Sequence, residues 1–425
     1  MTTPATTTTA TTTTTTATTW TAAFRSAPVS PYESMPLIHP SRGFADETLR
    51  QIVRVRGSGE QLRIRLTNRF GRQPLTVGRT RVAAHRAGST IVPGTDRAVT
   101  FAGAAHVVIP EGAEVVSDVV EFATTDETDL VLSTYHPVPT GLATYHPFTL
   151  QTGYVAPGDV TADPTLPAAV PVEPRFHLGG IDVLAAEPRR VVAVFGDSLT
   201  DGVGTTPGAH LRYPDLLGRR IGAATVLNLG IAGNRLLADV FGERGVARFD
   251  RDVLELPGLD RVIVQIGLND IGLATMFDTP AVSAADLIAG PTSIARRAGA
   301  RGVGTIATTV TPFGGAAGLA PGLDTPENEE TRQRVNDWIR TTHEFDAYAD
   351  LDHALRDPAA PTALRPEYDS GDHIHPNDAG AEAMAAATAE APPRNRPLAG
   401  SGPARRGVGG PAGWRAGRGP DVCSS

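Results

Sequence analysis

Residues 191–202 read VVAVFGDSLTDG, and this stretch decides the fold of the second half of the chain. The apolar run from Val191 to Phe195 is typical of a buried strand, and it stops at Gly196, where a turn leads into a helix. Ligands bind beyond the carboxyl ends of the strands in open α/β sheets, so Ser198 stands where a reactive hydroxyl would be useful. This pattern is weak evidence by itself, because a serine at a strand-to-helix turn is more often an N-cap.

Strands and helices alternate after this stretch. Further buried strands are predicted at residues 225–229, 261–266 and 302–309, and helices near residues 213–221, at 285–298, from Thr325-Pro326 onward and at 379–389. Alternating elements of this length predict an α/β fold with a doubly wound parallel sheet.

Residues 20–150 have a different pattern. Gln61–Thr67 alternates strictly, so Leu62, Ile64 and Leu66 share one face. Short strands of this kind, separated by turns such as Pro110-Glu111-Gly112, predict a smaller all-β sandwich or jelly-roll domain. We assign the arginines of its first strands to a solvated face rather than to a binding patch; they are Arg50, Arg54, Arg56, Arg63 and Arg65.

The length of 425 residues exceeds what one core usually holds, so more than one domain is expected. Composition and pattern divide the chain into a disordered Thr-rich segment, a β-sandwich domain, a linker rich in Pro, Gly and Ala, an α/β domain and a disordered basic tail. These parts correspond to residues 1–19, 20–150, 151–190, 191–390 and 391–425.

Composition also excludes several kinds of chemistry. None of the 38 basic residues is Lys, so neither a Lys Schiff base nor a Walker-type phosphate loop is available. The only cysteine is Cys423, which leaves no internal disulfide and no Cys-ligated zinc site. The net charge of -8 argues against nucleic acid as a partner, and no apolar stretch is long enough to span a membrane. We expect a monomer that needs no cofactor and no metal.

The numbered start carries neither a basic n-region nor an apolar h-region, which favours a cytoplasmic location. A mis-assigned start codon would instead hide an export signal and make the protein secreted.

Two later strands end in loops that can stabilise negative charge. Residues 230–235 read GIAGNR, and a glycine such as Gly233 can present its backbone N–H to an anionic centre, although it can equally serve the turn alone. Residues 267–270 read GLND, and the amide of Asn269 can donate to a developing oxyanion.

A third loop, residues 372–376, reads DHIHP. Asp372 three residues before His375 can accept from the imidazole Nδ1–H and leave Nε2 free as a general base. A metal site is the alternative, because His373 and His375 share a strand face near Asp372 and Asp378. It lacks further ligands elsewhere and leaves Gly-Asp-Ser-Leu unexplained.

Together these four blocks resemble those of the SGNH (GDSL-type) hydrolases, in the family's order, from Val191 to about Ala389. Residues 48–51 (TLRQ) and the turn at 68–71 (NRFG) look like the extra β-domain of a bacterial two-domain subgroup. The sequence Gly196-Asp197-Ser198-Leu199-Thr200 also lacks the second glycine of G-x-S-x-G, which argues against the commoner esterase fold.

The resemblance implies an SGNH (flavodoxin-like) fold and an esterase that works through an acyl-serine. In that scheme Ser198 is the nucleophile, His375 the base and Asp372 its orienting acid. The oxyanion hole consists of the Ser198 N–H, the Gly233 N–H and the Asn269 side chain.

The substrate is less defined. The loops at 273–283 and 313–323 are rich in Gly and Ala, which favours short acyl groups, such as acetyl on a carbohydrate or another small molecule. The alternatives are an acyltransferase that uses the same acyl-serine, a lysophospholipase or lipase-like hydrolase, and a non-catalytic glycan-binding protein.

Overall fold

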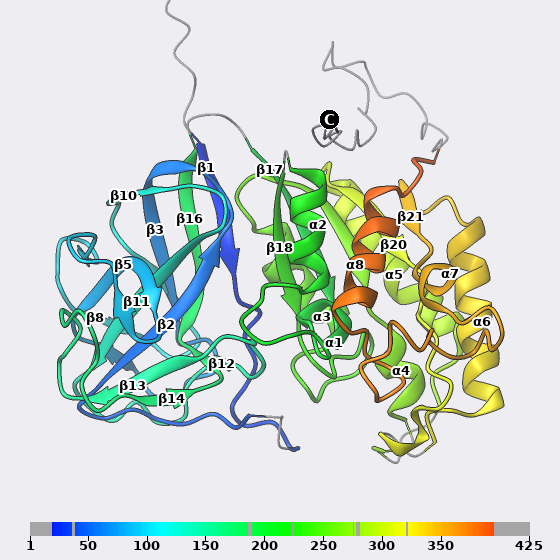
Figure 1. Ribbon diagram of the computed structural model, residues 1–425, viewed down its shortest axis with the longest axis horizontal. Helices are drawn as coiled ribbons and strands as arrows, with labels where there is room; N and C mark the ends of the chain where they lie inside the picture. The colour runs from blue at the N-terminus through cyan, green and yellow to red at the C-terminus, as the bar shows by residue number, and fades with distance from the viewer. Residues whose placement is uncertain are drawn as a thin grey trace, which may run out of the picture.

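The computed structural model describes residues 19–35, 39–185, 189–222, 224–274, 276–277, 281–319 and 322–394. The predictions for residues 1–19 and 391–425 therefore fall almost entirely outside the described residues. Figure 1 shows an all-β domain formed by the first part of the chain beside an α/β domain formed by the second part.

Two antiparallel sheets form the body of the β-domain. The first has the order β1 (Thr19–Arg25), β16 (Leu178–Ala185), β3 (Gly59–Thr67) and β10 (Val120–Thr124), with β9 (Glu114–Val116) also on β3. The second has the order β14 (Val170–Val172), β13 (Gly153–Pro157), β2 (Glu47–Val55), β11 (Thr128–His136), β5 (Thr80–Ala87) and β6 (Thr90–Ile91), with β7 (Arg97–Val99) also on β5. Two short pairs complete the domain: β4 (Leu75–Val77) with β8 (Val107–Ile109), and β12 (Tyr145–His146) with β15 (Arg175–Phe176).

A shared apolar core holds the two sheets together. The alternation predicted for β3 is confirmed, since Leu62, Ile64 and Leu66 are buried. They belong to the same cluster as Leu130 and Leu132 of β11, which lies in the other sheet. Burial of this kind contributes about 25 cal/mol per Å² of apolar surface and fixes the register of both sheets.

The linker predicted at residues 151–190 is wrong, because this region contains β13 to β16. Strand β16 lies between β1 and β3, in the interior of its sheet. A strand that is buried on both faces shows no polar alternation, and two glycines weaken its pattern further. Gly180 is needed there, because a Cβ at this position would come within 2.8 Å of the Phe24 carbonyl oxygen of β1.

The solvated face predicted for the arginines is also wrong at two positions. Arg50 is fully buried; its Nε donates to Ser133 Oγ at 2.9 Å, and its other nitrogens donate to backbone carbonyls. Arg56 crosses to the α/β domain and donates to the Asp215 carbonyl at 3.0 Å. A guanidinium has five N–H donors, so a buried arginine can bind several carbonyl oxygens at once. The strand pattern alone predicts a solvent-exposed arginine at such a position.

The α/β domain is built on a parallel sheet of order β18-β17-β19-β20-β21. The strands are β17 (Arg190–Gly196), β18 (Ala224–Gly230), β19 (Leu259–Gln265), β20 (Gly304–Thr308) and β21 (Ala347–Ala349). The parallel α/β arrangement predicted from the alternation is confirmed. Strand β17 lies between β18 and β19, so the chain adds β18 on one side of β17 and then adds β19 and the later strands on the other side. Ligands bind at such a switch point in open α/β sheets.

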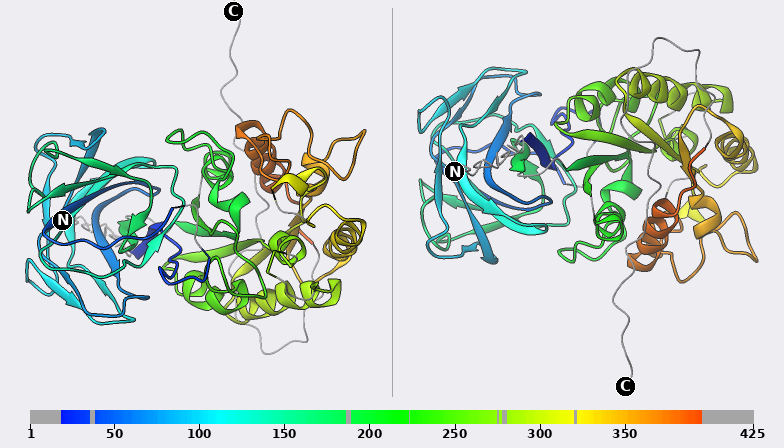
Figure 2. Two further views of the ribbon diagram at one scale, coloured as in Figure 1. Left: turned by 90° about the horizontal axis from the view of Figure 1, so that it is seen from below. Right: turned by 90° about the horizontal axis from the view of Figure 1, so that it is seen from above.

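Helices cover both faces of this sheet, as Figure 2 shows. The helices α2 and α8 pack together on one face, and α3 and α5 pack together on the other, with α6 beside α5. Their bounds, with those of the shorter helices, are α1 (Ser198–Asp201), α2 (Tyr213–Ile221), α3 (Gly245–Phe249), α4 (Leu268–Gly272), α5 (Ala284–Ala300), α6 (Pro326–Thr341), α7 (Leu351–Leu355) and α8 (Asp378–Ala389). A π-helical turn (Asp250–Leu254) and a 3-10 turn (Ala316–Gly318) complete the set. The predicted start of α6 is confirmed: Thr325 accepts from the Asn328 N–H, and Pro326 is the first helical residue.

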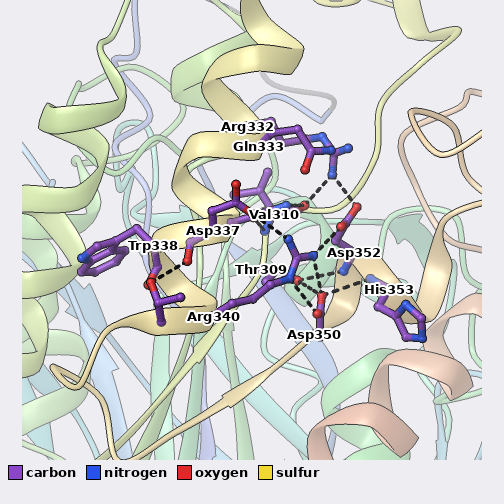
Figure 3. A network of polar contacts seen from close by, with 12 residues as sticks. Thr309, Val310, Arg332, Gln333, Asp337, Trp338, Arg340, Asp350, Asp352 and His353 are labelled. Atoms are coloured by element: carbon purple, nitrogen blue, oxygen red, sulfur yellow. Dashed lines mark hydrogen bonds and ion pairs between the residues drawn. The ribbon is translucent and has the colours of Figure 1, made fainter.

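A buried ionic network joins α6 to the end of β20 and to α7 (Figure 3). Arg332 and Asp352 are both fully buried and lie 2.6 Å apart. Arg332 also donates to the Val310 carbonyl, and Arg340 donates to both Asp350 and Asp352. The network fixes the chain that leaves β20 on its way to the loop at residues 310–324.

The two domains share buried contacts. Ala22 of β1 belongs to the same apolar cluster as the strands of the α/β sheet, and its N–H donates to the Pro257 carbonyl. Near the switch point, His146 of β12 contacts Asp201 of α1 at 3.0 Å. No helix in the described part of the chain has the length and apolar character needed to cross a membrane.

Candidate active site

The turn from β17 into α1 presents Ser198 at the end of the central strand. A Cβ at Gly196 would lie 2.0 Å from Thr200 Oγ1, so this position accepts only glycine. Asp197 is the N-cap of α1, with its Oδ1 accepting from the Leu199 N–H at 3.1 Å. Since Asp197 has the capping role, the N-cap alternative for Ser198 does not hold.

Asp197 is fully buried, and the side chain of Gln265 lies beside its carboxyl group. Burial raises the pKa of Asp197 to about 7, against an opposing hydrogen bond from the Leu199 N–H.

Ser198, His375 and Asp372 form a continuous hydrogen-bonded chain. His375 Nε2 lies 2.8 Å from Ser198 Oγ, and His375 Nδ1 lies 2.6 Å from Asp372 Oδ2. Burial raises the pKa of Asp372, but the hydrogen bond and charge of His375 and two backbone N–H groups outweigh it and hold the pKa well below the usual range. An ionised Asp372 can only accept, so Nδ1 carries the proton and Nε2 is free to take one from Ser198.

His373 belongs to a different contact. Its Nδ1 lies 2.6 Å from Asp369 Oδ2, and its side chain is 54% exposed. The spacing that favours His375 over His373 therefore matches the geometry. Within the described residues, no three or more His, Cys, Asp or Glu side chains are grouped so that they could hold a metal ion.

Gly233 and Asn269 line the same cavity as Ser198 and His375. Gly233 has a φ of 77°, and a Cβ there would approach the ring of Phe241 to 2.9 Å. Asn269 Nδ2 donates one hydrogen to the Asn234 carbonyl at 3.0 Å. An amide nitrogen carries two hydrogens, so the second is available to an oxyanion.

The loop that carries Gly233 is held by groups that sequence reasoning missed. Arg248 is fully buried and donates to the carbonyls of Gly196 and Leu229 and to Asn234 Oδ1, so it joins the ends of β17 and β18. Asp270 accepts from the N–H groups of Leu236 and Leu237, at 2.6 and 2.8 Å. Burial raises the pKa of Asp270 to about 6.

Asp201 is a further residue of this kind. Its Oδ2 accepts from the Ala232 N–H at 3.0 Å, next to Gly233, while its Oδ1 faces His146. Asp201 lies two residues after Leu199, at the end of α1, so its acidic character close to Gly-Asp-Ser-Leu could have pointed to it. Arg248 pairs locally with Asp252, but its contact with Gly196, like that of His146 with Asp201, joins segments far apart in the sequence and has no local signal.

A cavity of about 380 Å³ opens beside Ser198. Among the described residues, the polar side chains of its lining are Ser198, Asn269 and His375. The other lining residues are Pro147, Phe148, Val203, Ala232, Gly233, Phe241, Leu268, Gly272, Leu273, Met276, Leu319, Leu323 and Ile374. The site therefore combines a hydrogen-bonded serine with an apolar recess.

Comparison with solved structures finds chains of low identity that are similar to the α/β half of this chain. A structure of an aryl esterase from M. smegmatis is 17% identical and covers 47% of this chain and 97% of its own, with a TM-score of 0.37. A carbohydrate acetylesterase from Sinorhizobium meliloti is 16% identical over 47% of this chain and 96% of its own, with a TM-score of 0.36. A GDSL-like lipase from Bacteroides thetaiotaomicron is 18% identical over 47% and 85%, with a TM-score of 0.36. Similarity at this level says nothing about substrate, and comparison with curated proteins gave no match.

The family evidence comes from the sequence of the α/β domain. Residues 194–383 match the model of the GDSL-like lipase/acylhydrolase family, and this segment starts within β17 and ends within α8. The matched region contains Ser198, Asp372 and His375 and the loops of Gly233 and Asn269. The α/β domain thus belongs to the GDSL-like lipase/acylhydrolase family, and the protein is a carboxylic ester hydrolase.

Proposed function

We propose that the protein is a serine esterase in which Ser198 attacks the ester carbonyl. The observation that carries this proposal is the hydrogen-bonded chain from Ser198 Oγ through His375 to Asp372, with distances of 2.8 and 2.6 Å. His375 takes the Ser198 proton as the hydroxyl attacks, and returns it to the leaving alkoxide. Water then attacks the acyl-serine with His375 again as base, which releases the acid and restores Ser198.

The developing oxyanion needs donors that are already in place. The N–H groups of Ser198 and Gly233 and the free hydrogen of Asn269 Nδ2 are assigned this role. Such donors stabilise the tetrahedral intermediate without reorganisation during the reaction. The contacts from Arg248, Asp270 and Asp201 support the assignment, because they fix the loop on which Gly233 lies.

The acyl group is assigned to the apolar cavity. An acetyl group would occupy a small part of about 380 Å³, since one water molecule takes about 30 Å³ in the liquid. A sugar would find no polar partner there beyond Ser198, Asn269 and His375. The sequence favoured short acyl groups, and we now propose that the cavity also accepts longer apolar acyl chains. The alcohol part of the ester would then lie outside the cavity.

An acyl-chain series tests this assignment. Each methylene that enters the cavity should add about 0.8 kcal/mol, or about fourfold in kcat/KM, until the cavity is full. Hydrolysis of p-nitrophenyl esters from acetate to decanoate would measure the dependence. A maximum at acetate would contradict the assignment and favour an acetyl esterase.

Replacement of the nucleophile tests the mechanism itself. Ser198→Ala should abolish hydrolysis of p-nitrophenyl butyrate and prevent labelling by a fluorophosphonate. Ser283→Ala is a matched control, because Ser283 caps α5 and is absent from the cavity lining; it should keep both properties. Labelling that persists in Ser198→Ala would overturn the proposed mechanism.

A further inference from the structure

Two residues of the cavity come from outside the α/β domain. Pro147 and Phe148 lie between β12 and β13, which are strands of the β-domain. The remaining lining residues follow strands of the parallel sheet or belong to its helices and loops. The β-domain thus supplies part of the wall around Ser198.

His146, which precedes Pro147 and Phe148, holds the first end of this two-residue segment in place. His146 is buried, its Nδ1 donates to the Ala27 carbonyl at 2.8 Å, and its Nε2 lies 3.0 Å from Asp201 Oδ1. One ring therefore holds the lead-in segment after β1, the strand β12 and the helix that begins with Ser198.

The residues that follow Phe148 are held in place as well. Thr149 is buried, and its hydroxyl lies 2.8 Å from the Gln151 carbonyl oxygen and 2.6 Å from the Glu173 carbonyl oxygen, so its one hydrogen can be donated to either. The Leu150 carbonyl accepts from the Gly208 N–H of the α/β domain at 2.8 Å. With both ends held, Pro147 and Phe148 cannot move away from the cavity without breaking several hydrogen bonds.

From these contacts we propose that Phe148 determines the length of acyl chain that the enzyme accepts. Among the described residues, its ring is the large side chain that the β-domain contributes to the cavity, which Leu268, Leu273 and Leu323 also line. The β-domain is then a part of the substrate-binding site. This inference rests on the proposed esterase function and on the placement of the acyl group in the cavity.

Two substitutions at one position test the proposal. Phe148→Ala enlarges the cavity and should move the optimum of kcat/KM to longer chains. Phe148→Trp should reduce kcat/KM on the longest chains that the wild type accepts by about fourfold per displaced methylene, and should reduce kcat/KM on acetate by a smaller factor. The measurement is kcat/KM for p-nitrophenyl esters from acetate to decanoate on the full chain.

Leu142→Ala is the matched control. Leu142 precedes β12 in the same segment and is 40% exposed, but it does not line the cavity, so its chain-length profile should match that of the wild type. Fluorophosphonate labelling and the thermal midpoint of each variant report whether Ser198 and the fold are intact. If Phe148→Ala fails to fold, Phe148→Leu and Phe148→Trp give the same comparison.

The outcomes separate the two proposals. The proposed role of Phe148 is overturned if folded Phe148 variants show the same dependence of kcat/KM on acyl-chain length as the wild type. This holds whatever the outcome for Ser198→Ala. Hydrolysis that survives Ser198→Ala overturns the esterase mechanism, even where the Phe148 profiles shift.

Discussion

At the scale of single residues, Asp197 places an ionisable group beside Ser198. The folded protein keeps the proton of Asp197 up to about pH 7, whereas the unfolded chain loses it near pH 4. The unfolded state binds fewer protons between these values, so the free energy of unfolding falls as the pH rises from about 4 to about 7.

Asp197→Asn should therefore be more stable than the wild type above pH 7, by a few kcal/mol, with little difference near pH 4. The asparagine oxygen can still accept from the Leu199 N–H, which preserves the N-cap. Urea unfolding of both proteins from pH 4 to pH 8 measures the difference. Curves that stay parallel across this range would show that Asp197 does not titrate as described.

Asn269 tests the oxyanion hole. Asn269→Ala should lower kcat on the order of a hundredfold, or about 3 kcal/mol of barrier, while fluorophosphonate labelling stays detectable. Steady-state kinetics with p-nitrophenyl butyrate provide the measurement. Unchanged turnover would remove Asn269 from the oxyanion hole.

The sequence named candidate residues where a motif combined their chemistry with a strand end or a short polar turn. The structure brings Ser198, Gly233, Asn269 and His375 to one cavity, with Asp372 directly behind His375. Sequence reasoning missed Arg248 and His146. Their contacts with Gly196 and Asp201 form only after distant segments have folded together.

At the scale of elements, α6 and α7 depend on the network drawn in Figure 3. Asp352→Ala would leave the fully buried guanidinium of Arg332 without its carboxylate partner on α7. Loss of one member of a buried pair costs about 3–5 kcal/mol, so the free energy of unfolding should fall by that amount.

Glu330→Ala is the control for this effect. Glu330 pairs with Arg334 on the exposed side of the same helix, and both side chains are about 70% exposed. Its loss should change stability by less than about 0.5 kcal/mol. Equal effects of the two substitutions in urea unfolding would contradict the structural role of the network.

The end of β11 brings a second pH dependence. His136 stacks on Phe44 at 5.2 Å and lies 5.5 Å from the ring of His177. Burial lowers the pKa of His177 to about 4. The unfolded chain takes up this proton near pH 6.5, so the contribution of His177 to stability is lost progressively as the pH falls from about 6.5 to about 4.

His177→Asn should flatten that loss. Asparagine tolerates the φ of 54° at this position and does not titrate. The free energy of unfolding of the variant should depend less steeply on pH between 6.5 and 4 than that of the wild type. Identical slopes would show that His177 is protonated in the folded protein.

Element prediction from sequence succeeded where caps and apolar runs were clear, as for β17, α5 and α6. It failed at residues 151–190, because β16 is buried on both faces and β14 contains Pro171, which is tolerated only at a sheet edge. The pairing of β16 with β1 and β3 depends on strands more than a hundred residues earlier, and no local pattern records it.

At the scale of the whole molecule, the two domains should unfold as one unit. Ala22 of β1 packs in the core of the α/β domain, and the buried contacts His146 with Asp201 and Arg56 with Asp215 cross the interface. We expect a single calorimetric transition whose van't Hoff and calorimetric enthalpies agree. Two resolved transitions would show that the domains are independent.

The pairing of β1 with β16 has a consequence for biosynthesis. These strands are the first and last of the β-domain, and β1 lies at the edge of its sheet with β16 as its only strand neighbour in the described residues. At about 5–20 residues per second, a ribosome needs about eight to thirty seconds to make the chain that separates them. During this interval the nascent chain carries β1 without its partner. The β-domain can complete its fold only after Leu178–Ala185 has been made, when β17 of the α/β domain, which begins at Arg190, is the next strand to be translated.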